Sequence, residues 1–293
     1  AAIDIGSNAV RMLICYVFPS GDEYVFQKNS YLRLPIRLGE DSFKKGIISN
    51  EKISLLTNAI LSFKYIMKVH GVKDYKIYAT SALRESRNSK EVISIVKKNT
   101  DLKIELITGL KEANTISKGN SLEKIEFNKT FLYVDVGGGS TELTIISDGE
   151  KQTSKSFSIG SVRLLEGKVQ KSYWNVMHDW INDSTRSLGQ IKAIGSGGNI
   201  NKIASMLGKY KGESVSRTAI KKIIKKINTK DIQDRITVLG LRPDRADVII
   251  HASKIYLNCM KWAAAKKIIV PQSGLADGMV SQLYDHYKSN NIG

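Results

Sequence analysis

The stretch Ile3-Asp4-Ile5-Gly6-Ser7-Asn8 has a pattern that returns as Val134-Asp135-Val136-Gly137-Gly138-Gly139. Apolar residues follow each copy, as far as Val17 in the first and Ile146 in the second. This pattern predicts a strand, a tight turn and a second strand. Because a repeated motif indicates a repeated structural unit, the sequence predicts a duplicated fold.

Each copy places an aspartate between apolar neighbours, two residues before a glycine. Glycine at such a turn lets backbone N–H groups approach an anion without interference from a Cβ atom. Two of these hairpins facing each other would hold a phosphate chain from both sides. Ordinary β-hairpins are the alternative, since their turns often contain Gly, Ser and Asn. The repeated Asp-x-Gly spacing favours phosphate binding, and the sequence has neither the P-loop nor the dinucleotide fingerprint.

The rest of the chain alternates between helical and strand patterns, which is typical of an α/β protein. Helices are expected over residues 51–69, 90–99, 111–118, 199–207, 217–230 and 275–287, and further strands over 75–79, 104–107, 191–194 and 268–270. The polar segment 121–128 has no clear period and is the expected crossing between domains. We therefore expect an N-terminal domain over 1–125 and a C-terminal domain over 126–293, with the helix of about 280–293 able to pack back on the first.

Composition limits the classes of function. Lys and Arg number 45 against 28 Asp and Glu, and the net charge of +17 attracts anions of any kind. No apolar run approaches the roughly 20 residues that span a bilayer, and no signal peptide is recognisable, so a soluble, cytoplasmic protein without a membrane partner is expected. Cys15 and Cys259 predict neither a disulfide nor a zinc site. Nucleic-acid binding is not expected, because no recognised motif accompanies the charge.

The motifs resemble those of the exopolyphosphatase and guanosine pentaphosphate phosphatase family, within the actin, hexokinase and Hsp70 fold superfamily. The resemblance covers almost the whole chain and rests on residues 4–8, 79–85, Gly109 with Glu112-Ala113, 135–142 and 159–163. It implies an α/β protein of two ribonuclease-H-like domains with a cleft between them. Long members continue into helical domains, whereas this sequence is similar to a short form.

The resemblance also implies phosphate-binding residues. Gly6, Ser7 and Asn8 match the first loop of the family, and Gly137, Gly138, Gly139 and Ser140 match the second. Arg84 matches the positively charged position of the family and would hold phosphate oxygens with its guanidinium group. An exposed arginine on the first turn of a helix is the alternative, although the helix dipole does not favour a cation there.

Hydrolysis of a terminal phosphate needs a directed water molecule and cations that neutralise the transition state. Glu112 matches the catalytic glutamate of the family, which would orient or deprotonate the water. Glu142 matches another acidic residue that could bind metal or assist the base, and Asp4 and Asp135 would anchor Mg²⁺ or another divalent cation. The helix dipole would also favour Glu112 near a helix start. The family usually has two consecutive glutamates here, whereas this chain has Lys111-Glu112.

Two features leave alternatives open. The run Gly195-Ser196-Gly197-Gly198 predicts either a nucleotide contact or a simple strand-to-helix turn. Helix 217–230 carries a lysine face that is usually only solvated, although some lysines could follow a polyphosphate chain.

Three functions are compatible with the sequence. An exopolyphosphatase acting on inorganic polyphosphate is favoured, and a guanosine pentaphosphate or nucleoside triphosphate hydrolase is the second. The third is a non-catalytic sensor of polyphosphate or alarmone, against which the retained Glu112 and Glu142 argue. A homodimer is common in the family.

Overall fold

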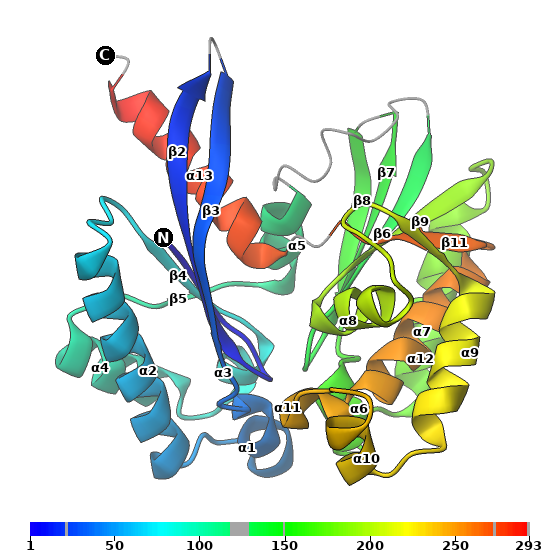
Figure 1. Ribbon diagram of the computed structural model, residues 1–293, viewed down its shortest axis with the longest axis horizontal. Coiled ribbons are helices and arrows are strands. Elements are labelled where there is room, and N and C mark those ends of the chain that lie inside the picture. The colour runs from blue at the N-terminus through cyan, green and yellow to red at the C-terminus, as the bar shows by residue number, and fades with distance from the viewer. Residues whose placement is uncertain (21–22, 118–128, 149, 272–273, 292–293) are drawn as a thin grey trace. The chain divides into compact units, whose positions relative to one another are not determined.

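The computed structural model describes residues 1–20, 23–117, 129–148, 150–271 and 274–291 (Figure 1). Its contacts divide the chain into two compact units, Ala1–Asn120 with Leu275–Gly293 and Ser121–Gly274. The final helix thus groups with the first unit. The crossing expected over 121–128, and with it the boundary at residue 125, lies outside the described residues.

The first unit is built on a five-stranded sheet in the order β3-β2-β1-β4-β5. Its strands are β1 (Ala2–Ile5), β2 (Val10–Ser20), β3 (Glu23–Leu34), β4 (Lys76–Ala79) and β5 (Glu105–Leu106). Its helices are α1 (Leu38–Lys45), α2 (Asn50–Val69), α3 (Ser81–Glu85), α4 (Ser89–Thr100), α5 (Gly109–Ser117) and α13 (Leu275–Asn291). Strand β1 runs antiparallel to β2 and parallel to β4, so the sheet is mixed.

The second unit is built on a six-stranded sheet in the order β10-β11-β9-β6-β7-β8. Its strands are β6 (Thr130–Val136), β7 (Thr141–Ser147), β8 (Glu150–Phe157), β9 (Ile191–Ser196), β10 (Ser214–Ser216) and β11 (Lys267–Ile269). Its helices are α6 (Ser161–Leu165), α7 (Lys171–Thr185), α8 (Gly198–Met206), α9 (Arg217–Asn228), α10 (Ile232–Thr237), α11 (Pro243–Ala246) and α12 (Ile249–Trp262).

The two units share one plan. The succession β1-β2-β3-α1 recurs as β6-β7-β8-α6, and β4 and β9 each lie parallel to the first strand of their hairpin. Read from the opposite edge, the second sheet has the strand order of the first with β10 added outside β11. The predicted α/β duplication of ribonuclease-H-like type is confirmed.

Each unit has its own apolar core. In the first unit, α2 buries Ile53, Leu56, Ile60 and Phe63, whose spacing of three and four residues places them on one face of the helix. In the second unit, the central strand β6 and the helix α12 supply many of the residues that pack into one cluster. Strands β6 and β9 lie in the interior of the sheet, and nearly all of their residues are buried.

Cys15 and Cys259 are both free thiols. Burial raises the pKa of the Cys15 thiol to about 11 and that of the Cys259 thiol to about 12. In the part of the chain that the structure describes, no helix combines the length and the apolar character that crossing a bilayer requires.

Candidate active site

The two glycine turns close in the same way. The N–H of Gly6 donates to the carbonyl of Ala9 over 3.1 Å, and the N–H of Gly137 donates to the carbonyl of Ser140 over 3.0 Å. The register of the flanking strands is also the same, because each turn joins strands whose last and first residues pair directly. The sequence repeat therefore corresponds to a repeated hairpin geometry.

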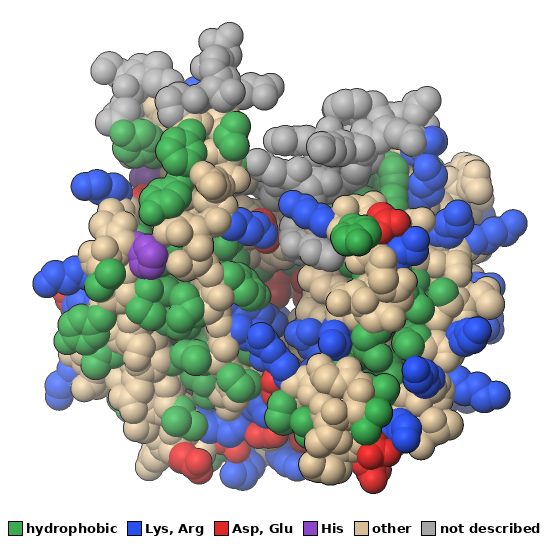
Figure 2. Space-filling view, viewed as in Figure 1, with side chains coloured by type: hydrophobic (Ala, Val, Ile, Leu, Met, Phe, Trp, Pro, Cys, Tyr) green, Lys and Arg blue, Asp and Glu red, His purple; other side chains and the backbone are tan. Residues whose placement is uncertain are grey.

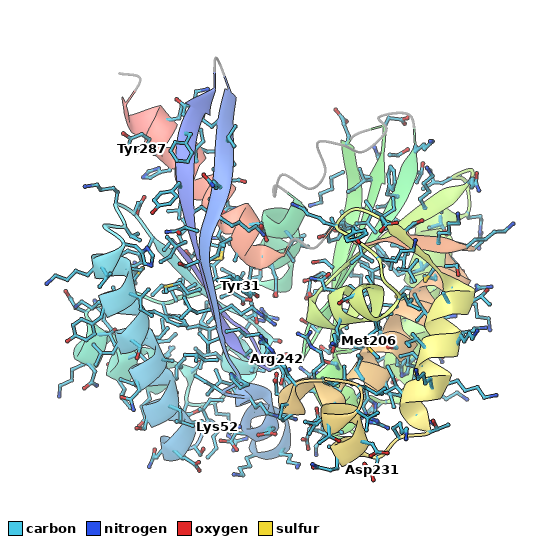
Figure 3. The ribbon with its side chains drawn as sticks, viewed as in Figure 1. Tyr31, Lys52, Met206, Asp231, Arg242 and Tyr287 are labelled. Carbon is cyan, nitrogen blue, oxygen red and sulfur yellow. The ribbon has the colours of Figure 1, made fainter. Side chains whose placement is uncertain are left out.

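The carbonyl groups of the first loop are held by the start of α1. The N–H of Gly39 donates to the Ser7 carbonyl over 2.8 Å, and the N–H of Arg37 donates to the Asn8 carbonyl over 3.1 Å. Arg37 adopts a left-handed conformation with φ of 56°, and its own carbonyl accepts from the ammonium of Lys52, which is labelled in Figure 3. The loop is thus tied to α1 and α2 through its acceptor side.

The carbonyl groups of the second loop are held by the start of α6. The N–H and hydroxyl of Ser161 donate to the Gly137 carbonyl, the N–H of Arg163 donates to the Gly138 carbonyl, and Nε of Arg163 donates to the Gly139 carbonyl over 2.7 Å. Within the described residues, no backbone carbonyl accepts from the N–H of Gly138 or Gly139. Because the carbonyl and N–H of a peptide unit point in opposite directions, anchoring the carbonyls leaves donors for an anion on the other side.

Gly160 explains why the motif at 159–163 belongs with the loop. A Cβ atom at Gly160 would overlap the backbone of Gly138. Only a glycine lets the start of α6 approach the loop closely enough to hold its carbonyls. In the sequence, only the resemblance to the family indicates this motif. In the structure, the motif positions the second loop.

The aspartates of the two hairpins have different cross-strand partners. Asp4 pairs with Arg11 and Asp135 pairs with Glu142, at equivalent positions of the two hairpins. Arg11 Nη1 lies 2.5 Å from Asp4 Oδ2, so the first hairpin carries an ion pair. The second hairpin instead places two carboxylates on one face of the sheet, with Cβ atoms about 4.5–5.5 Å apart as expected for directly opposed residues.

Glu142 is positioned by two hydroxyl groups. It is 2% exposed, and its Oε1 accepts hydrogen bonds from Ser140 over 2.7 Å and from Ser156 over 2.8 Å. The contact with Ser140 links the carboxylate to the second loop. Ser140 therefore has a role in orienting Glu142 as well as a place in the loop.

The predicted metal ligands differ in how well they are suited to bind a divalent cation. Carboxylate oxygens from Asp135 and Glu142 suit Mg²⁺, which proteins often bind through one or two carboxylates while several waters remain. Asp4 fits less well, because the Arg11 guanidinium already holds one of its oxygens. Among the described residues, no three His, Cys, Asp or Glu side chains are grouped to hold a metal.

Glu112 and Arg84 lie together in the first unit. Glu112 is in the first turn of α5 and only 8% exposed, and its Oε2 lies 3.9 Å from Nη1 of Arg84. The same guanidinium donates to the carbonyl of Ile107 over 2.6 Å. A buried carboxylate beside a fixed cation is an arrangement that can direct water at a phosphate while neutralising its charge.

The position of Arg84 in its helix differs from the position that the sequence predicted. Arg84 lies in the last turn of the five-residue helix α3, not in the first, so the helix dipole favours a cation there. The helix starts directly after β4, and Oγ of Ser81 at its start lies 3.0 Å from Oγ of Ser7 in the first loop. The short helix therefore connects the first loop to Arg84.

The glycine run at 195–198 forms a strand-to-helix turn against the second loop. Gly197 has φ of 110°, and a Cβ there would lie 2.8 Å from the Val136 carbonyl and 3.6 Å from Oδ1 of Asp135. A Cβ at Gly198 would lie 2.6 Å from Nη2 of Arg245. Residues 195–198 thus form a strand-to-helix turn beside the predicted metal ligand Asp135, and the nucleotide contact stays a prediction.

Sequence reasoning missed two arginines at these loops, Arg11 and Arg245. Arg11 follows Gly6 by five residues, as Glu142 follows Gly137, so aligning the two repeats would have found it. Arg245 lies in α11, far along the chain from the turn that it approaches, and no local pattern indicates it.

The chain is similar to known proteins in sequence and in fold. A bifunctional 3-dehydroquinate synthase/phosphatase of Fusobacterium nucleatum is 31% identical, and the match covers 93% of this chain and 45% of that protein, so the chain spans just under half of its length. Exopolyphosphatase 1 of Mycobacterium leprae is 22% identical over 97% of this chain and 88% of that protein. The crystal structure of an exopolyphosphatase from Cytophaga hutchinsonii shares the fold with a TM-score of 0.84, at 23% identity over 97% of each chain.

The family model of the Ppx/GppA phosphatases matches residues 22–286. This match takes in the Glu112 and Arg84 pair and the second hairpin with its loop and anchor, whereas the first hairpin, β1 and β2, precedes it. The chain belongs to the Ppx/GppA phosphatase family.

Proposed function

We propose that the chain is a phosphoanhydride hydrolase that releases the terminal phosphate of inorganic polyphosphate. The observation that carries this proposal is the buried Glu112 carboxylate, held 3.9 Å from the Arg84 guanidinium in the first unit. Binding alone needs no carboxylate beside a phosphate-binding cation, whereas hydrolysis needs a group that accepts a proton from water. A non-catalytic sensor is therefore the weaker proposal.

Each glycine loop would bind phosphate within its own unit. Gly6, Ser7 and Asn8 would offer backbone and hydroxyl donors to phosphate oxygens in the first unit, and Gly137 to Ser140 would do so in the second. Arg84 would hold the phosphoryl group under attack, and Glu112 would orient the water and take its proton. Most of the rate enhancement would come from these fixed donors, as is usual in phosphoryl transfer.

A divalent cation, most simply Mg²⁺, is part of this proposal. Asp135 and Glu142 would hold it, directly or through water, with Ser140 and Ser156 fixing the Glu142 carboxylate. When bound, the cation would neutralise charge on bridging and terminal phosphate oxygens. Asp4 has a different proposed role, which is to fix Arg11 next to the first loop.

The substitution Glu112→Gln tests the assignment, because it removes the proton acceptor and keeps the size of the side chain. We expect kcat for phosphate release from polyphosphate with Mg²⁺ to fall by about 10²–10⁴-fold, the usual contribution of a general base, with a small change in KM. Glu105→Gln is a matched control, because Glu105 is exposed and pairs with Lys111 on the same unit. A Glu112→Gln enzyme as active as its parent would refute the assignment of Glu112.

Guanosine pentaphosphate is a second candidate substrate. The observation that favours it is the turn at Gly197 and Gly198, which lies beside Asp135 and Arg245 and could receive a nucleoside near the phosphate site. The same assay with guanosine pentaphosphate in place of polyphosphate separates the candidates through the ratio of their kcat/KM values.

A further inference from the structure

Helices α9 and α12 of the second unit border a pocket of about 410 Å³. Four cationic side chains line it, Arg217 and Lys221 from α9 and Lys254 and Lys261 from α12. Aliphatic side chains, among them Ile224 and Leu257, supply its apolar part. The volume is within the range of pockets that bind small molecules, roughly 300–1,000 Å³.

The spacing of these residues places them on facing stripes of the two helices. In α9 they are four and three residues apart, and in α12 three and four, which is the period of one helix face. Neither helix contains an Asp or a Glu along its length. Figure 2 shows Lys and Arg side chains gathered over α9. The positive character of the pocket therefore comes from both walls.

Within the described residues, none of the four cations forms an ion pair. Lys254 instead lies 5.6 Å from the ring centre of Trp174. Like charges one helical turn apart destabilise a helix by a few tenths of a kcal/mol, roughly 0.2–0.5 per pair. The four cations around this pocket are therefore complementary in charge to an anion.

The neighbouring His251 responds to the same field. Burial lowers the pKa of His251, and the nearby Lys254 and Arg235 lower it further, while Asp247 acts in the opposite direction. Burial is the main cause, and Lys254, the second, is itself one of the cations that line the pocket.

We propose that the pocket between α9 and α12 is a second anion site, which binds a ligand carrying several phosphoryl groups. None of its lining residues belongs to the glycine loops or to the Asp135 and Glu142 pair. A nucleotide and an inorganic phosphate chain share this chemistry. The aliphatic part of the lining favours the nucleotide, because a base can cover apolar side chains that an inorganic chain cannot.

Isothermal titration of the full chain tests the site. The Glu112→Gln protein is used to suppress turnover, and tripolyphosphate and guanosine triphosphate are titrated separately. We expect two binding sites per chain in this parent and the loss of one of them in Lys221→Glu/Lys254→Glu. The double variant Lys225→Glu/Lys226→Glu is the control, because it changes the net charge of the protein by the same amount at two residues of α9 that do not line the pocket.

The outcomes separate this proposal from the catalytic one. A pocket variant that keeps every site of its parent overturns the second site, whatever the loops do. A parent with one site that the pocket variant abolishes supports the pocket and counts against phosphate binding by the loops. Lys221→Ala/Lys254→Ala replaces the reversal variant if that variant does not fold, and a control variant that loses the same site overturns the assignment to these residues.

The two ligands identify the source of the phosphoryl groups. If the nucleotide binds the pocket at least tenfold more tightly than tripolyphosphate, the aliphatic side chains contribute and the natural ligand is a nucleotide. Equal affinities would indicate an inorganic chain.

Discussion

Arg11 and Glu142 occupy equivalent places in two copies of one hairpin, yet they carry opposite charges. In the first copy Arg11 neutralises Asp4, and its Nη1 lies 3.2 Å from the position that a Cβ of Gly6 would take. The guanidinium is thus fixed at the glycine turn, and the ion pair that it forms with Asp4 carries no net negative charge. In the second copy the paired carboxylates create negative charge, which suits a cation. The duplicated hairpin therefore predicts direct anion binding in one unit and metal-assisted binding in the other.

His251 gives a prediction for the pH dependence of stability. Its pKa in the folded protein lies below the value of about 6.5 for an unperturbed histidine, chiefly because it is half-buried and also because of Lys254. Between these two pKa values the unfolded chain binds more protons than the folded one, so the free energy of unfolding decreases as the pH falls through and below about 6.5.

The substitution His251→Gln should remove that contribution. We expect the urea midpoint of the parent to fall more between pH 7.5 and 5.5 than that of the variant. A steeper loss of stability in the His251 variant would contradict the sign of the shift.

At the scale of whole elements, the sequence predicted those strands and helices whose burial follows a local pattern. The hairpin strands β1 and β6 and the helix α2 have continuous or regularly spaced apolar residues, and they were predicted close to their observed bounds. Strand β8 was not predicted, because it is largely polar and exposed and lies at the edge of its sheet. Its conformation depends on pairing with β7, which no pattern within β8 itself indicates.

The features of the candidate site likewise divide into those that a local motif predicts and those that depend on the tertiary fold. The glycine loops, Arg84 and Glu112 could be found from motifs in the sequence. The ion pair of Asp4 with Arg11, and the hold of α6 on the second loop, depend on register and on contacts between distant segments. Such contacts are set by the tertiary fold, so nothing in the sequence indicated that Asp4, a predicted metal ligand, pairs with Arg11.

Packing of α13 on α5 gives a prediction at this scale. Gly278 lies in α13, and a Cβ there would overlap the carbonyl oxygen of Thr115 in α5. Alanine normally favours a helix over glycine by about 1 kcal/mol, whereas overpacking against an immobile backbone costs about 1–3 kcal/mol or more.

We therefore expect Gly278→Ala to lower the free energy of unfolding, measured by urea denaturation followed by circular dichroism. Gly189→Ala is the matched control, because a Cβ at Gly189 meets no atom within 4 Å. A Gly278→Ala protein more stable than its parent would mean that α13 does not approach α5 as closely as the structure has it.

The whole molecule carries a large excess of positive charge. Its net charge is +17, and four uncompensated cations gather at the pocket between α9 and α12 alone. Such a charge acts on a polyanion before contact, because the summed field raises its concentration near the surface and the rate of encounter. The effect should grow with the number of phosphates in the substrate and should concern association more than the chemical step.

Salt therefore separates long-range attraction from catalysis. Raising the ionic strength from about 10 mM to about 150 mM shortens the screening length from about 30 Å to about 8 Å, so distant lysines lose their influence while contacts inside the site persist. We expect kcat/KM for long polyphosphate to fall by about tenfold or more, with kcat nearly constant and a smaller fall for tripolyphosphate. Phosphate release at fixed free Mg²⁺, measured for long polyphosphate and for tripolyphosphate, gives kcat and kcat/KM for each. If kcat declined in step with kcat/KM, or if both chain lengths responded equally, the excess charge would act at the catalytic contacts themselves and not in drawing the polyanion to the protein.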